Sequence, residues 1–323
     1  MPAVSVIMPA YNVAPYIGEA IRSVLAQTFA DLELLVVDDG ATDGSAAIAE
    51  AWTARDSRVR VVRQANAGIS AARNHGLRLS RGRCLAILDS DDGWDPHYLQ
   101  AQMAILEARP DVDIVTGNAR FLGSTLDGRP ARPWPDPRPA PTLAGLLQDE
   151  TAVFIMSVFR RGVYDAIGGF DEALRTNEDY DFWLRAACAG FTFQRNDRPL
   201  GFYRRRDDSL SASDLRMLPG IIAVYRKVRP ALAGHPRELA IVDAQIVRFE
   251  TECVAADARG AIETGDFASA SHHLAALHRR RGGAALRIAS LMSRWTPTFF
   301  SGLYGVRRVR LALSRLARHR IAS

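Results

Sequence analysis

Residues 32–45 read LELLVVDDGATDGS, an apolar run of strand length that leads directly into an acidic turn with two glycines. We expect residues 32–37 to form a buried strand, because a short apolar run bounded by turn residues is typical of parallel sheets. Asp38, Asp39 and Gly40 follow it. Ligands of open α/β sheets bind beyond the carboxyl ends of the strands, so these two aspartates are candidate binding residues.

Apolar runs and helical periods alternate on both sides of this stretch. Strands are expected over 4–8, 59–63 and 84–88, and helices over 15–25, 70–79 and 96–107. This alternation predicts an α/β fold with a parallel, doubly wound sheet. Beyond about residue 215 strand patterns fade and helices are expected, including a hairpin of residues 255–264 and 267–279.

A second acidic cluster, Asp89-Ser90-Asp91-Asp92, follows the strand expected over 84–88. Three carboxylates in four residues repel one another, and a divalent cation relieves that repulsion. Carboxylate oxygens suit Mg²⁺ or Mn²⁺, and Mg²⁺ completes its shell with phosphate oxygens and water. The alternative is a solvated acidic turn that caps the helix expected from Pro96.

The turn at 38–45 has two interpretations of its own. An aspartate at a strand end can accept the imide N–H of uracil or thymine, or the segment is a strand-to-helix loop built from Asx turns. The sequence contains neither G-x-G-x-x-G nor G-x-x-x-x-G-K-[ST]. The dinucleotide fingerprint and the P-loop are therefore excluded.

Two later stretches of the sequence contain further candidate site residues. Arg73 lies early in the helix expected over 70–79, within the stretch NAGISAARNHGL (66–77), where it either pairs with a diphosphate or the nucleoside or is an ordinary surface arginine. Residues 178–185, EDYDFWLR, place carboxylates at a helix start. Such carboxylates complement the helix dipole, or one of them is a general base.

In order and spacing, six stretches resemble the motifs of the family 2 inverting glycosyltransferases. They are VSVIMPAYN (4–12), LELLVVDDGATDGS (32–45), NAGISAARNHGL (66–77), LDSDD (88–92), GGFDE (168–172) and EDYDFWLR (178–185). The resemblance covers about the first 212 residues. It implies a GT-A fold with a mixed sheet, a nucleotide-sugar donor carrying UDP or dTDP, a divalent metal cofactor (Mg²⁺ or Mn²⁺), and inversion at the anomeric carbon.

The same resemblance implies roles for residues at the donor site. Pro9 and Tyr11 would lie beside the nucleobase, and Asp39, with Asp38 before it, would bond the base. Arg73 would help to hold the nucleotide.

The resemblance also implies the catalytic groups. Asp89 and Asp91, with Asp92 adjacent, would form the acidic motif that holds the metal and the sugar, and Asp179 would be the catalytic base. Arg206 stands where the family often has a histidine. An arginine cannot ligate a metal but can grip a phosphate, so we expect the acidic motif to carry the metal alone.

Two rival functions remain open. A non-catalytic nucleotide-sugar or glycan-binding protein on the same fold is disfavoured by the presence of Asp89, Asp91 and Asp179. A nucleotidyltransferase needs a glycine-rich, basic phosphate loop after the first strand, and residues 9–12, PAYN, offer none. We expect a transferase that acts on a glycan or lipid-linked glycan acceptor in bacterial surface polysaccharide synthesis.

Charge is divided unevenly along the chain. The net charge is +5, but residues 267–323 contain 11 arginines and no Asp or Glu. This tail alternates arginines with apolar residues beside aromatic ones, a pattern that favours an amphipathic helix at an anionic lipid surface. A plain solvated face is the second interpretation, and nucleic acid is not expected as a partner because no nucleic-acid-binding motif accompanies the charge.

The sequence also predicts where the protein is located and how the chain is divided into domains. The three cysteines are far apart, residues 1–12 lack the pattern of a secretory signal, and no uncharged stretch is long enough to span a bilayer. We therefore expect a cytoplasmic protein that touches the inner membrane face through its tail. A GT-A domain is expected over 1–214 and a helical, basic region over 215–323.

Overall fold

A computed structural model describes residues 1–123, 126–205 and 214–295, and it divides the chain into two compact units. Unit 1 consists of Met1–Ala212 and Lys227–Leu239. Unit 2 consists of Ser213–Arg226 and Ala240–Ser323.

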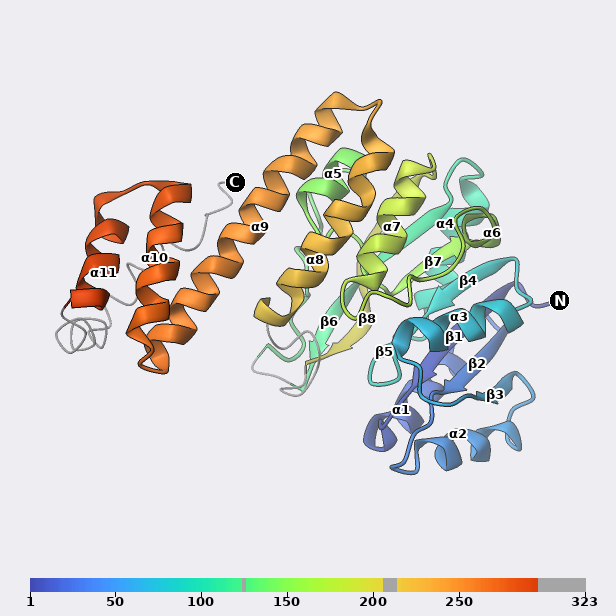
Figure 1. Ribbon diagram of the computed structural model, residues 1–323. Helices are drawn as coiled ribbons and strands as arrows, with labels where there is room; N and C mark the ends of the chain where they lie inside the picture. The colour runs from blue at the N-terminus through green and yellow to red at the C-terminus, as the bar shows by residue number, and fades with distance from the viewer. Residues whose placement is uncertain (124–125, 206–213, 296–323) are drawn as a thin grey trace. The chain divides into compact units, whose positions relative to one another are not determined.

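An eight-stranded sheet forms the centre of unit 1 (Figure 1). Its strands are β1 (Val4–Ala10), β2 (Leu32–Asp38), β3 (Val59–Arg63), β4 (Cys84–Ile87), β5 (Gly93–Trp94), β6 (Ile114–Leu122), β7 (Ser157–Arg160) and β8 (Phe193–Arg204). Their order across the sheet is β3-β2-β1-β4-β7-β6-β8-β5. β7 is antiparallel to both of its neighbours, β5 is antiparallel to β8, and the other neighbouring pairs are parallel. The α/β class and the mixed sheet are confirmed, and β1 to β4 are parallel to one another, as the alternation of strands and helices predicts.

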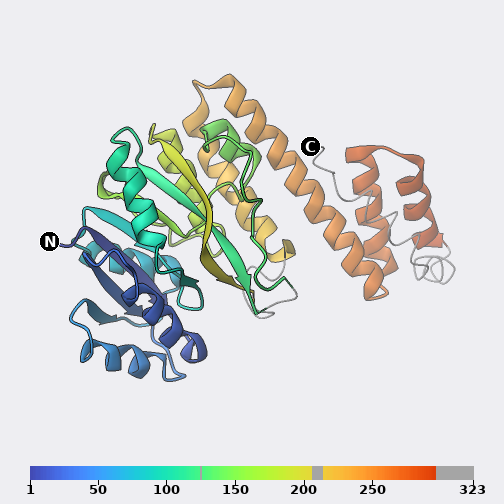
Figure 2. The same cartoon turned by 180° about the vertical axis from the view of Figure 1, so that it is seen from behind.

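Alternate residues of the central strands face opposite sides of the sheet, as strand geometry requires. On one side, Val6 and Val36 belong to the core that packs with α1 (Ala14–Leu25) and α4 (Tyr98–Ala108). On the other side, Ile7 lies against α3 (Ile69–Leu79), so close that a Cβ on Gly76 would be 2.5 Å from it. Helices therefore cover both faces of the sheet, with α3 in front in Figure 1 and α4 in front in Figure 2.

The other helices of unit 1 are α2 (Ser45–Thr53), α5 (Leu143–Gln148), α6 (Arg161–Ile167) and α7 (Glu178–Cys188). The strands and helices predicted between residues 4 and 107 begin and end within two residues of their expected bounds, whereas the helix expected over 255–264 is the end of α9, which begins at Pro236. Helix α4 begins at Tyr98 and not at Pro96, because the Pro96 carbonyl accepts a hydrogen bond from the Thr28 N–H at 2.8 Å. That carbonyl is then engaged outside the helix.

Helices make up the described part of unit 2 and its connections to unit 1. They are α8 (Asp214–Val228), the short 3-10 helix η2 (Arg229–Leu232), α9 (Pro236–Glu263), α10 (Phe267–Arg281) and α11 (Ala284–Trp295). Small and aliphatic side chains of α9, α10 and α11 form one core. Ser271 and Ser290 each donate a hydroxyl hydrogen bond of 2.9 Å to the other's carbonyl, which holds α10 closely against α11. Within the described ranges, no helix has the length and apolarity that crossing a bilayer requires.

Candidate active site

The carboxyl ends of the parallel strands meet at one edge of the sheet, and the acidic clusters lie at this edge. Strand β2 ends at Asp38, and the acidic loop, residues 88–92, follows the last residue of β4. Strand β8, parallel to β6, ends at Arg204 on the same edge. The expected binding edge is therefore where the charged side chains gather.

The acidic loop is fixed to the end of β8 by Arg204. The Arg204 N–H donates to the Asp92 carboxylate at 2.8 Å, and its guanidinium donates to the Asp91 carbonyl at 2.9 Å. Arg204 also pairs with Glu19 of α1 at 2.8 Å. Burial, with repulsion from Asp91 and Asp89, raises the pKa of Asp92 well above its usual range. The three carboxylates of this loop are thus close enough to repel one another.

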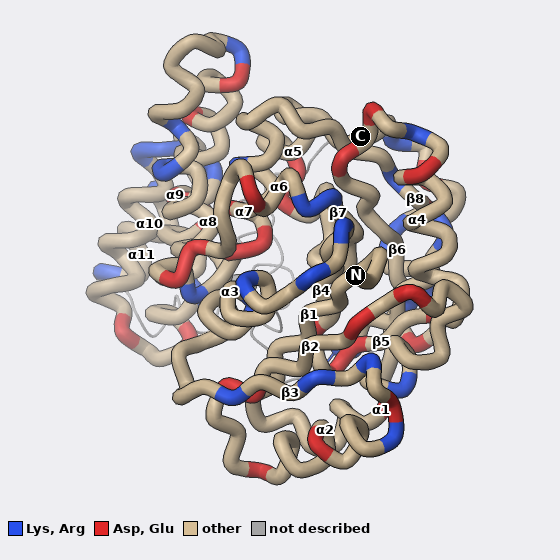
Figure 3. The backbone as a smooth tube through the Cα atoms, turned by 90° about the vertical axis from the view of Figure 1, so that its right-hand side faces the viewer, with Lys and Arg blue, Asp and Glu red and all other residues tan. Residues whose placement is uncertain are grey.

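Arg73 of α3 joins the acidic loop to the start of α7. Its side chain is 2% exposed, and its guanidinium lies 2.7 Å from Asp89 and 2.6 Å from Glu178. Burial opposes the charge of Arg73, but attraction to Asp89 and Glu178 outweighs burial and raises the pKa of Arg73. The guanidinium carbon of Arg73 also lies 5.3 Å from the centroid of the Phe170 ring. Figure 3 shows the basic segment of α3 beside the acidic start of α7.

Asp179 lies in the first turn of α7, next to this ion-pair cluster, and is half-buried. Burial and repulsion from Glu178 raise the pKa of Asp179 to about 7, while attraction to Arg73 opposes the rise. One carboxylate oxygen accepts the Tyr180 N–H at 2.8 Å. A carboxylate with this pKa is matched to accepting a proton near neutral pH.

The loop that precedes α7 is held to α3 by hydrogen bonds. Asn74 donates to the Phe170 carbonyl at 2.8 Å and accepts from the Phe170 N–H at 2.7 Å. Gly169 is required here, because a Cβ at this position would lie 2.1 Å from the Asn74 side-chain oxygen. Asn177, at the N-cap of α7, has φ 61°, the left-handed conformation that asparagine tolerates. The loop that leads to Asp179 is therefore held by hydrogen bonds to α3 and enters α7 through the N-cap residue Asn177.

The other acids of α7 are engaged in ion pairs. Asp181 is buried and lies 2.8 Å from both Arg185 and the ammonium of Lys227. Lys227 also pairs with Asp171 at 2.6 Å, so it ties α7 to the loop before it. Together with the pairing of Glu178 to Arg73, this leaves Asp179 as the acid of the first turn without a cation in direct contact among the described residues.

The residues expected around the nucleobase lie at the ends of β1 and β2. Asp39 is buried and accepts hydrogen bonds from Gln64, Ala67 N–H and Gly68 N–H, at 2.8, 2.9 and 2.9 Å. A carboxylate offers about four acceptor positions, and these bonds use three of them. Asp38, also buried, accepts from the Ala41 N–H at 2.9 Å.

Strand β1 contributes one buried and one exposed residue to this end of the site. Pro9 is buried within the strand, opposite Val37 of β2. Tyr11 follows the strand and is 50% exposed. Its ring is therefore accessible for stacking against a planar group.

The acidic loop fits a divalent ion that takes only one or two carboxylates. Asp89 and Asp91 would supply hard oxygen donors. Their repulsion adds to burial in raising the pKa of Asp92, and a cation would relieve that repulsion. Within the described part of the chain, no group of three or more His, Cys, Asp or Glu side chains is placed so that it could hold a metal ion. The remaining ligands would have to be diphosphate oxygens and water.

The structure brings some predicted residues together and leaves others apart. Arg73 and Asp89 are in direct contact, and Asp179 interacts electrostatically with both. Arg206 lies outside the described residues, as does the tail segment 296–323. Sequence reasoning missed the roles of Arg204 and Lys227; the only signal for Arg204 was its place in a run of three arginines at the end of a strand pattern.

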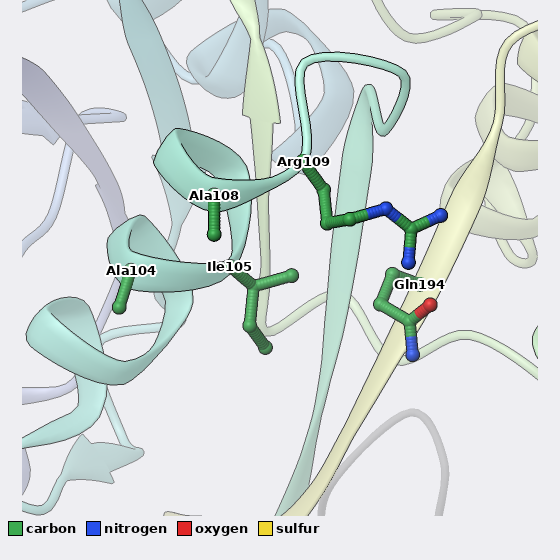
Figure 4. Close-up of a pocket in the computed structure, with 5 residues that line it drawn as sticks. All are labelled: Ala104, Ile105, Ala108, Arg109 and Gln194. Atoms are coloured by element: carbon green, nitrogen blue, oxygen red, sulfur yellow. The ribbon is translucent and has the colours of Figure 1, made fainter.

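A surface hollow elsewhere in unit 1 lies away from this site. It has a volume of about 360 Å³ and is lined by Ala104, Ile105, Ala108, Arg109 and Gln194 (Figure 4). Gln194 is near the start of β8, whereas Arg204 ends it. The hollow therefore lies at the amino ends of the parallel strands, opposite the acidic edge.

Comparison with known families identifies the fold and the family. The family model described as "Glycosyl transferase family 2" matches residues 5–168, which include β1 to β4, the acidic loop and Arg73. The chain belongs to glycosyl transferase family 2. The expected membership of family 2 is thereby confirmed.

Curated relatives of this family 2 chain come from bacteria. "Uncharacterized glycosyltransferase EpsJ" of Bacillus subtilis is 35% identical over 65% of this chain, and "Putative teichuronic acid biosynthesis glycosyltransferase TuaG" of the same species is 30% identical over 70%. "Succinoglycan biosynthesis protein ExoU" of Rhizobium meliloti is 32% identical over 59%. The match covers 63% of EpsJ, 88% of TuaG and 58% of ExoU, so the chain spans only part of two of these relatives.

Solved structures share the GT-A fold of this family 2 chain. S. aureus TarS 1–349 in complex with UDP-GlcNAc matches with a TM-score of 0.64 and 20% identity, over 93% of this chain and 89% of that one. Mannosyltransferase PcManGT from Pyrobaculum calidifontis, in complex with GDP-Man and Mn²⁺, matches with a TM-score of 0.63 and 20% identity, over 98% and 84%. At this identity the likeness establishes the fold alone.

Proposed function

We propose that this protein is a metal-dependent, inverting glycosyltransferase that moves a sugar from a UDP- or dTDP-linked donor to a hydroxyl of a glycan acceptor. The observation that carries the proposal is the placement of Asp179. It has a pKa of about 7 and stands next to an ion-pair cluster in which Arg73 joins Glu178 to Asp89 of the acidic loop. The proposed base therefore lies beside an ion-pair cluster that includes the proposed donor-binding residue Asp89.

Asp179 is the proposed general base. The acceptor hydroxyl is a weak nucleophile, and Asp179 takes its proton as the oxygen attacks the anomeric carbon. A bond forms between that oxygen and C1, and the bond from C1 to the diphosphate oxygen breaks. Attack on the face opposite the departing nucleoside diphosphate inverts the configuration at C1.

The neighbouring acids are less suited to this task. Glu178 forms an ion pair with Arg73 at 2.6 Å, and Asp181 is 3% exposed between Arg185 and Lys227. A base that is already paired with a cation holds its proton poorly, and Asp181 is paired with two cations. We therefore place these two acids in the supporting structure.

Donor binding is proposed at the ends of β1, β2 and β4. Tyr11 stacks on the base above Pro9, and the remaining acceptor position of Asp39, with Asp38 behind it, takes the imide N–H. Arg206 is proposed to grip the diphosphate, since a guanidinium binds phosphate through two N–H groups. Arg73 holds Asp89 in position, and its direct contact with the nucleotide stays a prediction.

A divalent ion, Mg²⁺ or Mn²⁺, is proposed at Asp89 and Asp91, with Asp92 behind them. When bound, it supplies positive charge that stabilises the departing diphosphate. Asp92 keeps the loop attached to β8 through its hydrogen bond with the Arg204 N–H. The PcManGT structure named above contains Mn²⁺ with its donor, which supports a metal in this fold.

The biological setting is proposed from the relatives. TuaG and ExoU carry teichuronic acid and succinoglycan biosynthesis in their names, so we propose a step in bacterial surface polysaccharide synthesis with a glycan or lipid-linked glycan acceptor. We place the protein in the cytoplasm, at the inner membrane face, with the basic C-terminal region as the contact. That region carries 11 arginines and no acidic residue after Asp266.

A thermal-shift screen of nucleotide sugars with Mn²⁺ tests the proposal. A donor present at 100 times its dissociation constant is expected to stabilise the folded protein by about 2.7 kcal/mol. Hydrolysis of the stabilising donor then separates an enzyme from a binding protein. Stabilisation without any hydrolysis or transfer would favour the non-catalytic alternative.

A further inference from the structure

Helix α11 exposes a row of large apolar side chains. Ile288, Leu291 and Trp295 are 55%, 50% and 72% exposed. They lie three and four residues apart, so they share one side of the helix. We call these three residues the outer face of α11.

The outer face lies opposite the side by which α11 is packed. Leu286, Ala289 and Ser293 are buried, and the first two belong to the core shared with α9 and α10. With 3.6 residues per turn, these buried positions point about half a turn away from Ile288, Leu291 and Trp295. Among the described helices, the outer face therefore takes no part in the core that α11 shares with α9 and α10.

The surroundings of the outer face are cationic. Arg287 and Arg294 are exposed on the same helix, and the Arg294 guanidinium carbon lies 5.4 Å from the Trp295 ring centroid. Residues 267–295, which include α10 and α11, contain five arginines and no Asp or Glu. A helix with apolar residues and tryptophan on one side and arginines beside them is typical of helices that lie in a membrane interface.

Charge decides between the partners that an apolar face can take. A second copy of this chain would bring the same arginines together, and the following segment, 296–323, carries six more arginines and no acid. Both partners would bring further positive charge close to Arg287 and Arg294, which flank the outer face. Anionic lipid headgroups instead attract the arginines while the acyl chains accept the apolar side chains.

We propose that the outer face of α11 inserts into the headgroup region of an anionic bilayer, with the helix lying along the surface. This inference rests on the membrane association proposed above and assigns it to a defined surface. The partner is a lipid surface rich in phosphatidylglycerol or similar anionic lipids. Arg287 and Arg294 contact the phosphates beside the inserted side chains.

Co-sedimentation of the full-length protein with vesicles tests this assignment. Vesicles of phosphatidylcholine alone are compared with vesicles of phosphatidylcholine and phosphatidylglycerol. The I288Q/L291Q variant is expected to lower affinity for the anionic vesicles by about tenfold or more, because two aliphatic side chains no longer leave water. R287Q/R294Q is expected to lower it by about fivefold for each arginine removed.

Val247 on α9 provides the matched control, because it is an aliphatic side chain 58% exposed on another helix of unit 2. V247Q should bind vesicles as the original protein does, and circular dichroism should show the same helix content in all variants. Vesicle binding by I288Q/L291Q at the original affinity would overturn the outer face as the contact while leaving membrane association intact.

Two other results would overturn the proposal differently. If the unmodified protein binds neither kind of vesicle, the proposed membrane association fails together with this surface. If it elutes as a dimer that I288Q/L291Q converts to a monomer, without vesicle binding, the partner is a second copy. Hydrolysis of the donor, measured in parallel, reports on the transferase proposal independently of both.

Discussion

Replacing Arg73 with methionine tests whether the ion-pair cluster holds the active site together. Arg73 is 2% exposed and contacts Asp89 at 2.7 Å and Glu178 at 2.6 Å. Its removal leaves those carboxylates, and Asp179 beside them, without their shared cation. Breaking a buried ion pair on one side costs about 3–5 kcal/mol, so R73M is expected to lower the free energy of unfolding by that amount at pH 8.

The cost of R73M is expected to depend on pH. Arg73 holds the pKa of Asp179 down, so in the variant this pKa rises above about 7. Protonation at lower pH then removes the repulsion among the acids. The difference in stability between the two proteins should therefore be largest at pH 8 and smaller at pH 5.

Urea unfolding at pH 8 and pH 5 measures both effects. R83M is the control, because Arg83 and Glu107 form an exposed pair at 3.0 Å, and such pairs contribute about 0–1 kcal/mol. R73K keeps the charge and should fold if R73M does not, at a smaller cost. A cost below about 1 kcal/mol for R73M, or an equal cost at both pH values, would refute the reasoning.

Three further outcomes are expected. Transfer rate should rise with pH and level off above about 7, because only the Asp179 carboxylate accepts a proton; a rate independent of pH between 5 and 8 would contradict this. An acid whose pKa is higher in the folded than in the unfolded chain lowers the stability of the folded protein at any pH above the pKa of the unfolded chain. D179N removes such an acid, so it should raise the free energy of unfolding at pH 8 by about 1–3 kcal/mol, and this gain should disappear near pH 4. Urea unfolding at the two pH values measures the difference. Calorimetry should show nucleoside diphosphate binding that EDTA abolishes and D91A weakens, and equal affinity with and without EDTA would remove the metal.

Much of the fold was predictable because local patterns agree with tertiary structure. The apolar runs at 4–8 and 32–37 form buried strands, and Ile17, Ile21 and Val24 are buried on one side of α1, as their spacing indicates. The antiparallel strands were not predictable in this way. β5 has two residues, Gly93–Trp94, and its pairing with β8 depends on residues more than 100 positions away.

The candidate site was predictable in its residue types but not in its contacts. Arg73 carried two interpretations, and the structure buries it, because Asp89 and Glu178 offset the cost of removing its charge from water. The Glu178 contact spans 105 positions along the chain, and no local pattern encodes it. Lys227 likewise reaches Asp171 and Asp181 from α8, in the region where no active-site residue was expected.

Some expectations stay predictions. These are the division of function between residues 1–214 and 215–323, the roles of the donor-site residues, and the binding of phosphate by Arg206. Arg206 and residues 296–323 of the basic tail lie outside the described residues.

The most direct test of the central claim compares turnover and donor binding in D179N. The substitution keeps the size of Asp179 and removes its basicity. With the donor that the thermal-shift screen identifies, turnover should fall by about 10²–10⁴-fold, the usual contribution of a general base. Donor affinity by calorimetry should stay within a factor of about two, because the change acts on the transition state. A folded D179N protein that transfers or hydrolyses the donor at the original rate would contradict the account.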